Sequence, residues 1–228
     1  MEILKYLISP GCAVADIGAN VGVYTYALSQ TVGTHGKVYA FEPIVDNFSI
    51  LTALVKSAHL TNAFVFQAAL GESPDECDMV IPEMDGFTDY YWAHVARPGD
   101  EGRKEKVRVL ALDELSQDGA IDTLSFIKCD VEGEELSVIR GGIETIRIQK
   151  PGCLFEVSKR TCDEVFVTFK NLKYRAFVLD RGLVEVDQFK DHYFSNYFFL
   201  HPSSETWRRL GQFSNLLPVI ENQKMPSR

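Results

Sequence analysis

Short hydrophobic runs alternate along the chain with segments in which hydrophobic residues recur at helical spacing. The short runs are rich in β-branched and aromatic residues, which is typical of buried strands, and lie at residues 12–17, 37–41, 62–70, 77–81, 107–112, 124–129 and 153–157. Helical spacing predicts helices at residues 23–32, around 48–55, and at 134–148, 163–172 and 204–217. This alternation predicts an α/β protein in which helices cover both faces of a sheet.

The C-terminal part of the chain departs from this alternation. Two runs at residues 174–179 and 183–186 flank Asp180-Arg-Gly182 and predict an antiparallel hairpin, and residues 197–200 predict a last strand. Residues 221–228 are polar, and we expect them to form a flexible tail. No internal repeat or linker interrupts the pattern, so residues 1–228 are expected to form a single domain.

The least regular segment lies in the middle of the chain, between two extended runs. It spans residues 82–106 and carries the aromatic patch Tyr90-Tyr91-Trp92. Loops of this length inside compact domains are mostly functional or disordered. We therefore expect residues 83–106 to form a loop that selects the substrate or closes over it.

Composition narrows the functional classes only modestly. The 228 residues are 46% hydrophobic and 24% charged, as in ordinary globular proteins, and the net charge of -9 disfavours long nucleic acid as a partner. No hydrophobic run is long enough to span a bilayer, and Glu2 and Lys5 interrupt the N-terminal segment, which does not resemble a secretory signal. Five scattered cysteines show no metal-binding spacing and indicate structural thiols in a reducing compartment. These features predict a cytoplasmic protein without a membrane span.

Acidic residues and glycines cluster where the predicted strands end. In open parallel sheets, ligands bind beyond the carboxyl ends of the strands, near the switch in strand order. The residues at these ends are Asp16-Ile-Gly18, Glu42-Pro43, Ala69-Leu-Gly71, Asp130 and Glu156. The sequence therefore predicts a ligand site along this edge of the sheet.

The glycines after the first strand are spaced Gly-x-x-x-Gly, from Gly18 to Gly22, so the dinucleotide fingerprint Gly-x-Gly-x-x-Gly is absent. Asp16 and Asn20 suit a cationic amino-acid group, although glycines in a plain strand-to-helix turn would also explain this segment. Glu42 stands where an acidic residue binds both hydroxyls of a ribose, and the alternative is a solvated carboxylate. Asn47 is expected to cap the following helix rather than to line the site.

These motifs resemble, in order, those of the FkbM family of methyltransferases. The matching segments are Val14-Ala-Asp-Ile-Gly-Ala-Asn-Val-Gly-Val-Tyr-Thr25, Tyr39-Ala-Phe-Glu-Pro43, Ala68-Ala-Leu-Gly71, Phe126-Ile-Lys-Cys-Asp-Val-Glu-Gly-Glu-Glu135, Val138-Ile-Arg-Gly-Gly142 and residues 151–157. The resemblance implies a Rossmann-like class I methyltransferase fold with a mostly parallel seven-stranded sheet and a C-terminal antiparallel hairpin. It also implies S-adenosyl-L-methionine as cofactor and O-methylation of a hydroxyl on a sugar, polysaccharide or polyketide-type molecule.

The resemblance further implies which residues bind the cofactor. Asp16, Gly18 and Asn20 would hold its methionine end, and Glu42 its ribose. Ala69 and Leu70 would lie against the adenine, and Asp130 would face the sulfonium and the acceptor. The complete expected set is Asp16, Gly18, Ala19, Asn20, Gly22, Glu42, Pro43, Ala69, Leu70 and Asp130.

A hydroxyl acceptor benefits from a general base. Asp130 is the first candidate, followed by Glu132 and Glu156; the alternatives are a helix-capping role for Glu132 and an ion pair of Glu156 with Lys128 or Lys159. The three carboxylates offer oxygen ligands to a hard cation, but no spacing of metal ligands compels one, and we expect no metal. His94 is a further base, or a solvated loop histidine.

Two other functional classes share this architecture. An NAD(P)-dependent oxidoreductase would also use Glu42, but the glycine spacing argues against it. A non-catalytic nucleotide-binding module is opposed by the intact set of Gly18, Gly22, Glu42 and Asp130.

Overall fold

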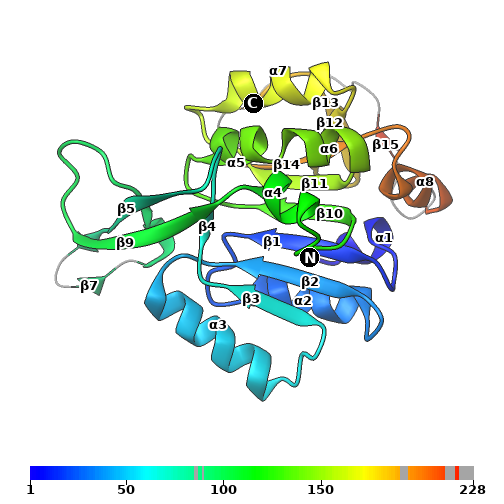
Figure 1. Cartoon of the computed structure of the whole chain (residues 1–228). Coiled ribbons are helices and arrows are strands. Elements are labelled where there is room, and N and C mark those ends of the chain that lie inside the picture. Colours follow the sequence, from blue (N-terminus) through cyan, green and yellow to red (C-terminus); the bar gives the residue numbers. More distant parts are fainter. Residues whose placement is uncertain (85–86, 89, 191–194, 214–218, 221–228) are drawn as a thin grey trace.

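The computed structural model of the chain describes residues 1–84, 87–88, 90–190, 195–213 and 219–220. Its main element is a nine-stranded sheet (Figure 1). In spatial order the strands are β15 (Val219–Ile220), β13 (Leu183–Val186), β12 (Arg175–Leu179), β14 (Asn196–Leu200), β11 (Gly152–Glu156), β10 (Leu124–Cys129), β1 (Ala13–Ile17), β2 (Lys37–Phe41) and β3 (Ala63–Phe66). The strands from β11 to β3 are parallel, whereas β14 is antiparallel to both of its neighbours. The expected mostly parallel α/β sheet is confirmed.

The hairpin near the C-terminus is also confirmed, since β12 and β13 pair antiparallel. The sheet nevertheless has nine strands in the described part of the chain rather than the expected seven. The additional strands are β13 and β15, which extend the edge beyond β12. Leu183, Val184 and Val186 of β13 are buried, so this strand joins the hydrophobic core instead of projecting as a free hairpin arm.

Helices cover both faces of the sheet, as expected. One face carries α1 (Leu4–Leu7), α2 (Val23–Val32), α3 (Val45–Ser57) and α8 (Glu205–Gln212), and the other carries α4 (Leu112–Gln117), α5 (Glu135–Gly141), α6 (Ile143–Gln149) and α7 (Cys162–Asn171). Side chains of β1 alternate between the two faces of the sheet and contribute to the hydrophobic core on each. Ala15 and Ile17 pack against the helices on one face, and Val14 packs against those on the other. None of the helices in the described ranges has the length and hydrophobicity needed to cross a membrane.

A second, smaller sheet extends to the left of the main body in Figure 1. Its strands are β4 (Ala69–Leu70), β9 (Arg103–Leu110), β5 (Asp75–Ile81) and β8 (His94–Val95); β6 (Glu83–Met84) pairs separately with β7 (Phe87–Thr88), and a short 3₁₀-helix spans Tyr90–Trp92. The expected loop at residues 83–106 therefore contains β6, β7, β8 and the first four residues of β9, so part of it is β-structure. The strand expected at residues 107–112 ends at Leu110 and is followed directly by α4.

Two elements expected as single are divided. Residues 62–70 form β3 and β4, which belong to different sheets, because the chain leaves the main sheet after Phe66. Residues 134–148 form α5 and α6, which meet at Gly142. A Cβ atom on Gly141 would lie 1.8 Å from the Gly71 carbonyl oxygen, so glycine is required where α5 contacts the end of β4.

The two ends of the chain also differ from expectation. The N-terminal segment, for which no helix was predicted, forms α1, whose Leu4 and Leu7 pack into the core. The last helix spans Glu205–Gln212 and starts with Ser204, whose side chain accepts a hydrogen bond from the Trp207 backbone. The expected continuation of this helix at 214–217 and the expected tail at 221–228 lie outside the described residues.

Candidate functional site

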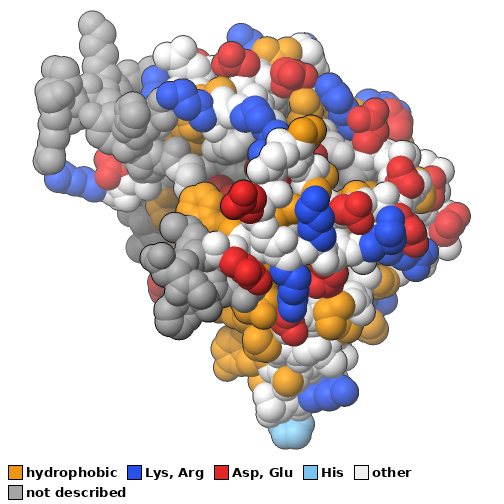
Figure 2. All heavy atoms as spheres, turned by 90° about the vertical axis from the view of Figure 1, so that its left-hand side faces the viewer, with side chains coloured by type: hydrophobic (Ala, Val, Ile, Leu, Met, Phe, Trp, Pro, Cys, Tyr) orange, Lys and Arg blue, Asp and Glu red, His pale blue; other side chains and the backbone are white. Residues whose placement is uncertain are grey.

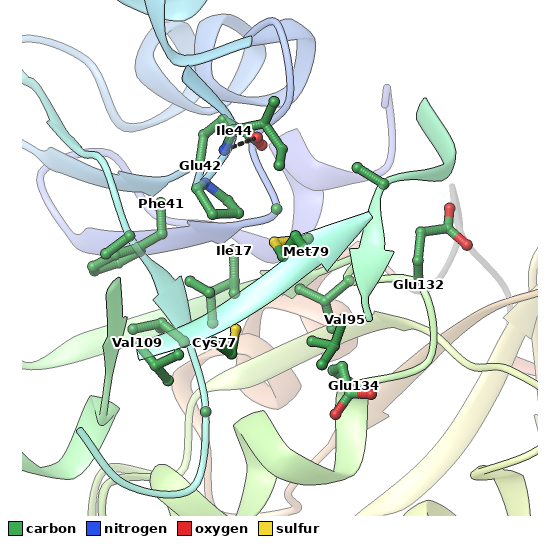
Figure 3. A pocket seen from close by; sticks show the side chains of 18 of the residues that line it. Ile17, Phe41, Glu42, Ile44, Cys77, Met79, Val95, Val109, Glu132 and Glu134 are labelled. Carbon is green, nitrogen blue, oxygen red and sulfur yellow. Dashed lines mark hydrogen bonds between the residues drawn. The ribbon is translucent and has the colours of Figure 1, made fainter. Parts of the chain in front are cut away.

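A cavity of about 510 Å³ lies at the carboxyl ends of β1, β2 and β10, beside the second sheet (Figure 3). The chain builds the main sheet outward from β1 through β2 to β3 and later continues on the other side with β10, so this is the switch point of the strand order. The expected site residues that line the cavity are Gly18, Asn20, Glu42, Pro43, Ala69, Leu70, Asp130, Glu132 and Glu156. The topology therefore brings together most of the residues singled out in the sequence.

The charged side chains that line this cavity are all acidic. They are Glu42, Glu72, Asp75, Glu76, Asp130, Glu132, Glu134 and Glu156, and no Lys, Arg or His is among the described lining residues. Figure 2 shows, by contrast, basic and acidic side chains interspersed over the outer face on the side of the second sheet. The cavity therefore suits a positively charged ligand and disfavours a pyrophosphate.

Glu42 is buried at the end of β2, with 4% of its surface exposed. Its Oε2 accepts a hydrogen bond of 2.8 Å from the Asn20 backbone N–H, and its Oε1 accepts one of 3.0 Å from Ile44. Burial raises the pKa of Glu42, and these two backbone donors and the Asn47 side chain partly offset the rise. Each oxygen keeps a lone pair for a further donor such as a ribose hydroxyl.

Asn47 lines the cavity instead of capping α3, which the structure shows without a side-chain cap. Its Nδ2 atom donates to the Tyr90 carbonyl oxygen at 3.4 Å, and its side chain also hydrogen-bonds Glu42. The expected capping role is therefore wrong. Asn47 links the acidic residue at the end of β2 to the segment that follows β7.

The glycines of the first turn serve close packing. Gly18 has φ +69°, and a Cβ atom there would lie 1.8 Å from the Asp130 carbonyl oxygen. Gly22, with φ +94°, begins α2, and a Cβ atom there would lie 2.7 Å from side-chain atoms of Leu51 and Leu54. Gly22 does not line the cavity, so the packing explanation holds for this residue. Ala19 is likewise buried, against Ala40 and Leu51.

Asp16 lies behind the cavity and is fully buried. Its Oδ2 accepts a 2.6 Å hydrogen bond from Thr25 Oγ1, and its Oδ1 lies 3.4 Å from Lys128 Nζ. Asp16 is not among the lining residues. In the structure Asp16 contacts Thr25 and Lys128 behind the cavity wall, and Lys128 in turn binds the Gly18 carbonyl oxygen. Asp16 therefore supports the glycine turn from behind and does not itself face the cavity.

Lys128, which the sequence suggested only as an ion-pair partner of Glu156, instead forms ion pairs with Asp16 and Asp130. Its Nζ atom donates a 2.8 Å hydrogen bond to the Gly18 carbonyl oxygen, lies 3.6 Å from Asp130 Oδ2, and stands 5.1 Å from the ring centroid of Tyr24. Burial acts to lower the pKa of Lys128, but Asp16 and Asp130 outweigh it and the pKa is raised. The contact between Lys128 and Asp130 could have been predicted from their spacing in the sequence, because side chains two residues apart in a strand lie on the same face.

The three carboxylates proposed as bases, Asp130, Glu132 and Glu156, all line the cavity, and Figure 3 shows Glu132 apart from Glu42. Burial raises the pKa of Glu132 to about 7, and the charges of Asp130 and Glu156 add to this rise. Burial and Asp130 likewise raise the pKa of Glu156, which shares a hydrogen bond with Asp130. Glu132 is therefore partly protonated near neutral pH.

The alternatives considered for neighbouring residues are decided by the contacts. The carboxylate that binds the backbone before α5 belongs to Glu135, which accepts from the Gly133 N–H at 2.7 Å and from Thr161 Oγ1 at 2.6 Å. The alternative of a capping role therefore applies to Glu135 and not to Glu132. His94 contacts Asp100 Oδ2 at 3.1 Å and the Trp92 carbonyl oxygen at 2.8 Å, and it does not line the cavity.

In the described part of the chain, no group of three or more His, Cys, Asp or Glu side chains is arranged to hold a metal ion. S-adenosylmethionine carries a positive sulfur, and the acidic lining of the cavity suits a ligand of that charge.

Comparison with solved structures supports the same fold. The crystal structure of the methyltransferase FkbM from Methylobacillus flagellatus KT matches with a TM-score of 0.56 and 19% identity, covering 82% of this chain and 43% of that one. This chain thus spans less than half of the length of that protein. A putative rRNA methylase from Clostridium thermocellum matches with a TM-score of 0.52 and 10% identity, covering 87% of this chain and 89% of that one. A search of curated proteins gave no match.

The family model of the methyltransferase FkbM domain matches residues 16–182. This range includes all described residues that line the first cavity, from Ile17 to Glu156. The match covers well over half of the chain and confirms the resemblance found in the motifs. The chain belongs to the FkbM methyltransferase family.

Proposed function

We propose that this chain transfers a methyl group from S-adenosylmethionine to a hydroxyl group of a small-molecule or glycan acceptor. Family membership gives S-adenosylmethionine as the cofactor. The observation that carries the proposal is the cavity at the switch point, which is lined by Glu42 and by the carboxylates of Asp130, Glu132 and Glu156. The pKa values of Glu132 and Glu156 are raised. This arrangement offers both a ribose acceptor and a proton acceptor.

The cofactor-binding residues divide along the cavity. Glu42 would accept hydrogen bonds from the ribose hydroxyls, while Ala69 and Leu70 would flank the adenine together with Ile44 of the same cavity wall. Asn20 lies at the amino-acid end, and its own backbone N–H is bound to Glu42. The hydrogen bond thus links the two parts of the proposed cofactor site. The Glu42 carboxylate that would bind the ribose also holds the turn that would position the amino-acid end of the cofactor.

When bound, S-adenosylmethionine supplies a methyl group on a positively charged sulfur, which leaves as a neutral thioether when the methyl carbon is attacked. The residues of the chain align the acceptor and take up its proton. Glu132 is the base that the surroundings favour, since a pKa of about 7 matches proton transfer near neutral pH. The hydroxyl proton passes to the Glu132 carboxylate as the acceptor oxygen forms its new bond to carbon, and solvent then removes it.

Asp130, the first candidate base in the sequence, takes a positioning role in this proposal. Lys128 lies 3.6 Å from its Oδ2 atom, and Glu156 shares a hydrogen bond with it. These contacts engage the Asp130 carboxylate and fix its direction. It would hold the acceptor hydroxyl, and Glu132 would accept the proton.

The segment at residues 83–106 is proposed to cover the reacting centre in the first cavity, where the cofactor meets the acceptor hydroxyl. Tyr90, Trp92 and Val95 contribute to the cavity lining, and Trp92 has 62% of its surface exposed. An exposed aromatic side chain at a cavity edge suits contact with a ligand that arrives from solvent. The side chain of Tyr91, the remaining member of the aromatic patch, lies outside the described residues.

Calorimetric titration with S-adenosylmethionine, S-adenosylhomocysteine and NAD tests the cofactor. Binding of both sulfur ligands in the micromolar range and no binding of NAD are expected. Glu42→Ala should weaken binding at least tenfold, because a charged hydrogen-bonding partner contributes about 1.5–3 kcal/mol. Glu76→Ala is the matched control, since Glu76 also lines the cavity but is exposed. Binding of NAD alone, or equal losses in both variants, would overturn the proposal.

A further inference from the structure

A second cavity, of about 280 Å³, lies on the face of the sheet covered by α1 and α2. Its hydrophobic walls come from Ile3, Leu4, Leu154, Leu179 and Phe198. No charged side chain is among its described lining residues. Its chemistry is thus the opposite of that of the first cavity, whose charged residues are all acidic.

The register of the main sheet connects this cavity to the carboxylates. In the antiparallel pair of β11 and β14, Leu154 stands opposite Phe198 and Glu156 stands opposite Asn196. Side chains two residues apart, and those directly opposite each other, lie on one face of a sheet. Glu156 therefore projects from the same face as the cavity walls, one step closer to the carboxyl ends of the strands.

Two of the three polar residues of the second cavity, Tyr24 and Ser195, lie next to the carboxylates Asp130 and Glu156 or to Lys128 beside them; the third is Asn196. Ser195 hydrogen-bonds the Glu156 carboxyl group, and Tyr24 lies over Lys128, which pairs with Asp130. Ser195 and Tyr24 both line the second cavity, whereas Asp130 and Glu156 line the first. These four side chains form the boundary between the two cavities.

We propose that the second cavity holds the body of the methyl acceptor, an uncharged and mostly hydrophobic alcohol or phenol whose hydroxyl reaches the carboxylates past Tyr24 and Ser195. This inference rests on the proposed function and narrows its acceptor class to uncharged hydrophobic alcohols and phenols. The polar end of the cavity receives the hydroxyl, and the hydrophobic end receives the hydrocarbon part.

Size and polarity both support this class of acceptor. A hydrophobic cavity of about 150 Å³ is large enough to bind benzene, so the second cavity accommodates a substituted ring. A bare sugar would place several hydroxyls against Ile3, Leu4 and Phe198, where they would lose their hydrogen bonds to water. An anionic acceptor would be repelled by Asp130 and Glu156 at the boundary.

The test uses phenol, 4-ethylphenol and 4-hydroxybenzoate as probes, titrated with and without S-adenosylhomocysteine and followed by NMR of labelled Ile, Leu and Val methyl groups. We expect shifts at Ile3, Leu4, Leu154 and Leu179, about tenfold tighter binding of 4-ethylphenol than of phenol, and no binding of 4-hydroxybenzoate. Shifts confined to first-cavity residues such as Ile44 and Val109, or equal binding of the benzoate, would overturn the inference.

A cavity-filling variant separates this site from general hydrophobic binding. Leu179→Trp should weaken 4-ethylphenol binding at least tenfold and leave S-adenosylhomocysteine affinity unchanged, because Leu179 lines only the second of the two cavities. The control is Val167→Trp, an exposed position on α7 at the other face of the sheet. Unchanged 4-ethylphenol affinity in Leu179→Trp would overturn the acceptor site even where the cofactor binds. Failure of S-adenosylhomocysteine to bind would instead overturn the proposed function.

Discussion

Lys128 Nζ lies 3.4 Å from Asp16 Oδ1, so that a buried cation on β10 meets a fully buried carboxylate at the end of β1. The same ammonium group donates to the Gly18 carbonyl oxygen, which follows β1 directly. The pair thereby joins the two strands that flank the switch point. Lys128 and Asp16 therefore hold the glycine turn in place, although neither side chain lines the cavity.

Lys128→Met should destabilise the fold, because it leaves Asp16 as a buried charge without its cation. Removal of one partner of a buried ion pair costs about 3–5 kcal/mol. We expect the free energy of unfolding in urea to fall by that amount, and the double variant Lys128→Met with Asp16→Asn to regain part of it. Lys104→Met, at an exposed position on β9, is the control. A double variant no more stable than Lys128→Met would contradict the pairing.

Gly18→Ala tests the close approach of the first turn to β10. The substitution combines a positive φ with a Cβ atom 1.8 Å from the Asp130 carbonyl oxygen, and overpacking of this kind adds about 1–3 kcal/mol to the backbone strain. Gly119→Ala is a matched control, because Gly119 has φ +70° and nothing within 4 Å of its Cβ position. Denaturation should show a clearly larger loss for Gly18→Ala, accompanied by weaker S-adenosylhomocysteine binding. Equal losses would show that backbone strain alone matters.

The sequence predicted the site residues that follow strands, since hydrophobic runs locate strand ends and parallel strands end at one edge of a sheet. Glu42, Asp130 and Glu156 lie at the cavity for this reason. Asp16 occupies the last but one position of β1, where its side chain points to the α2 face and is buried. The position of Asp16 in the strand therefore predicted that it lies near the cavity, but not that its side chain contacts Thr25 instead of lining the cavity.

The second sheet and the role of Lys128 could not be predicted in the same way. The pairing of β5 with β9 joins segments separated by more than twenty residues, and β9 is rich in charged residues such as Arg103 and Lys106. Hydrophobic alternation does not identify such a strand. Lys128 is buried only because Asp16, Gly18 and Asp130 converge on it, and this convergence depends on the tertiary fold.

Glu132 makes stability depend on pH. Its pKa of about 7 in the folded state exceeds the ordinary value of 4.5, so the folded chain retains a proton that the unfolded chain has released. This stabilisation is complete below about pH 4.5 and is lost as the pH rises through about 7. Glu132→Gln remains neutral throughout, so its advantage over the wild type should grow by about 1–2 kcal/mol between those limits, allowing for solvent screening. Urea denaturation at several pH values measures it, with exposed Glu101→Gln as control; a difference independent of pH would contradict it.

The same ionisation should govern methyl transfer. With 4-ethylphenol as acceptor, kcat is expected to rise with pH through about 7 and then level off, because only the ionised form of Glu132 accepts the proton. Glu132→Gln should lower kcat by about 10²–10⁴-fold, remove this limb of the profile and leave S-adenosylhomocysteine affinity unchanged.

Asp130→Asn is the comparison that separates the base from its neighbour. It keeps Glu132 but loses the carboxylate that contacts Lys128 and Glu156. Because Asp130 also raises the pKa of Glu132, the remaining limb of the profile should move to lower pH in this variant. A limb that disappears in Asp130→Asn and persists in Glu132→Gln would assign the base to Asp130 instead.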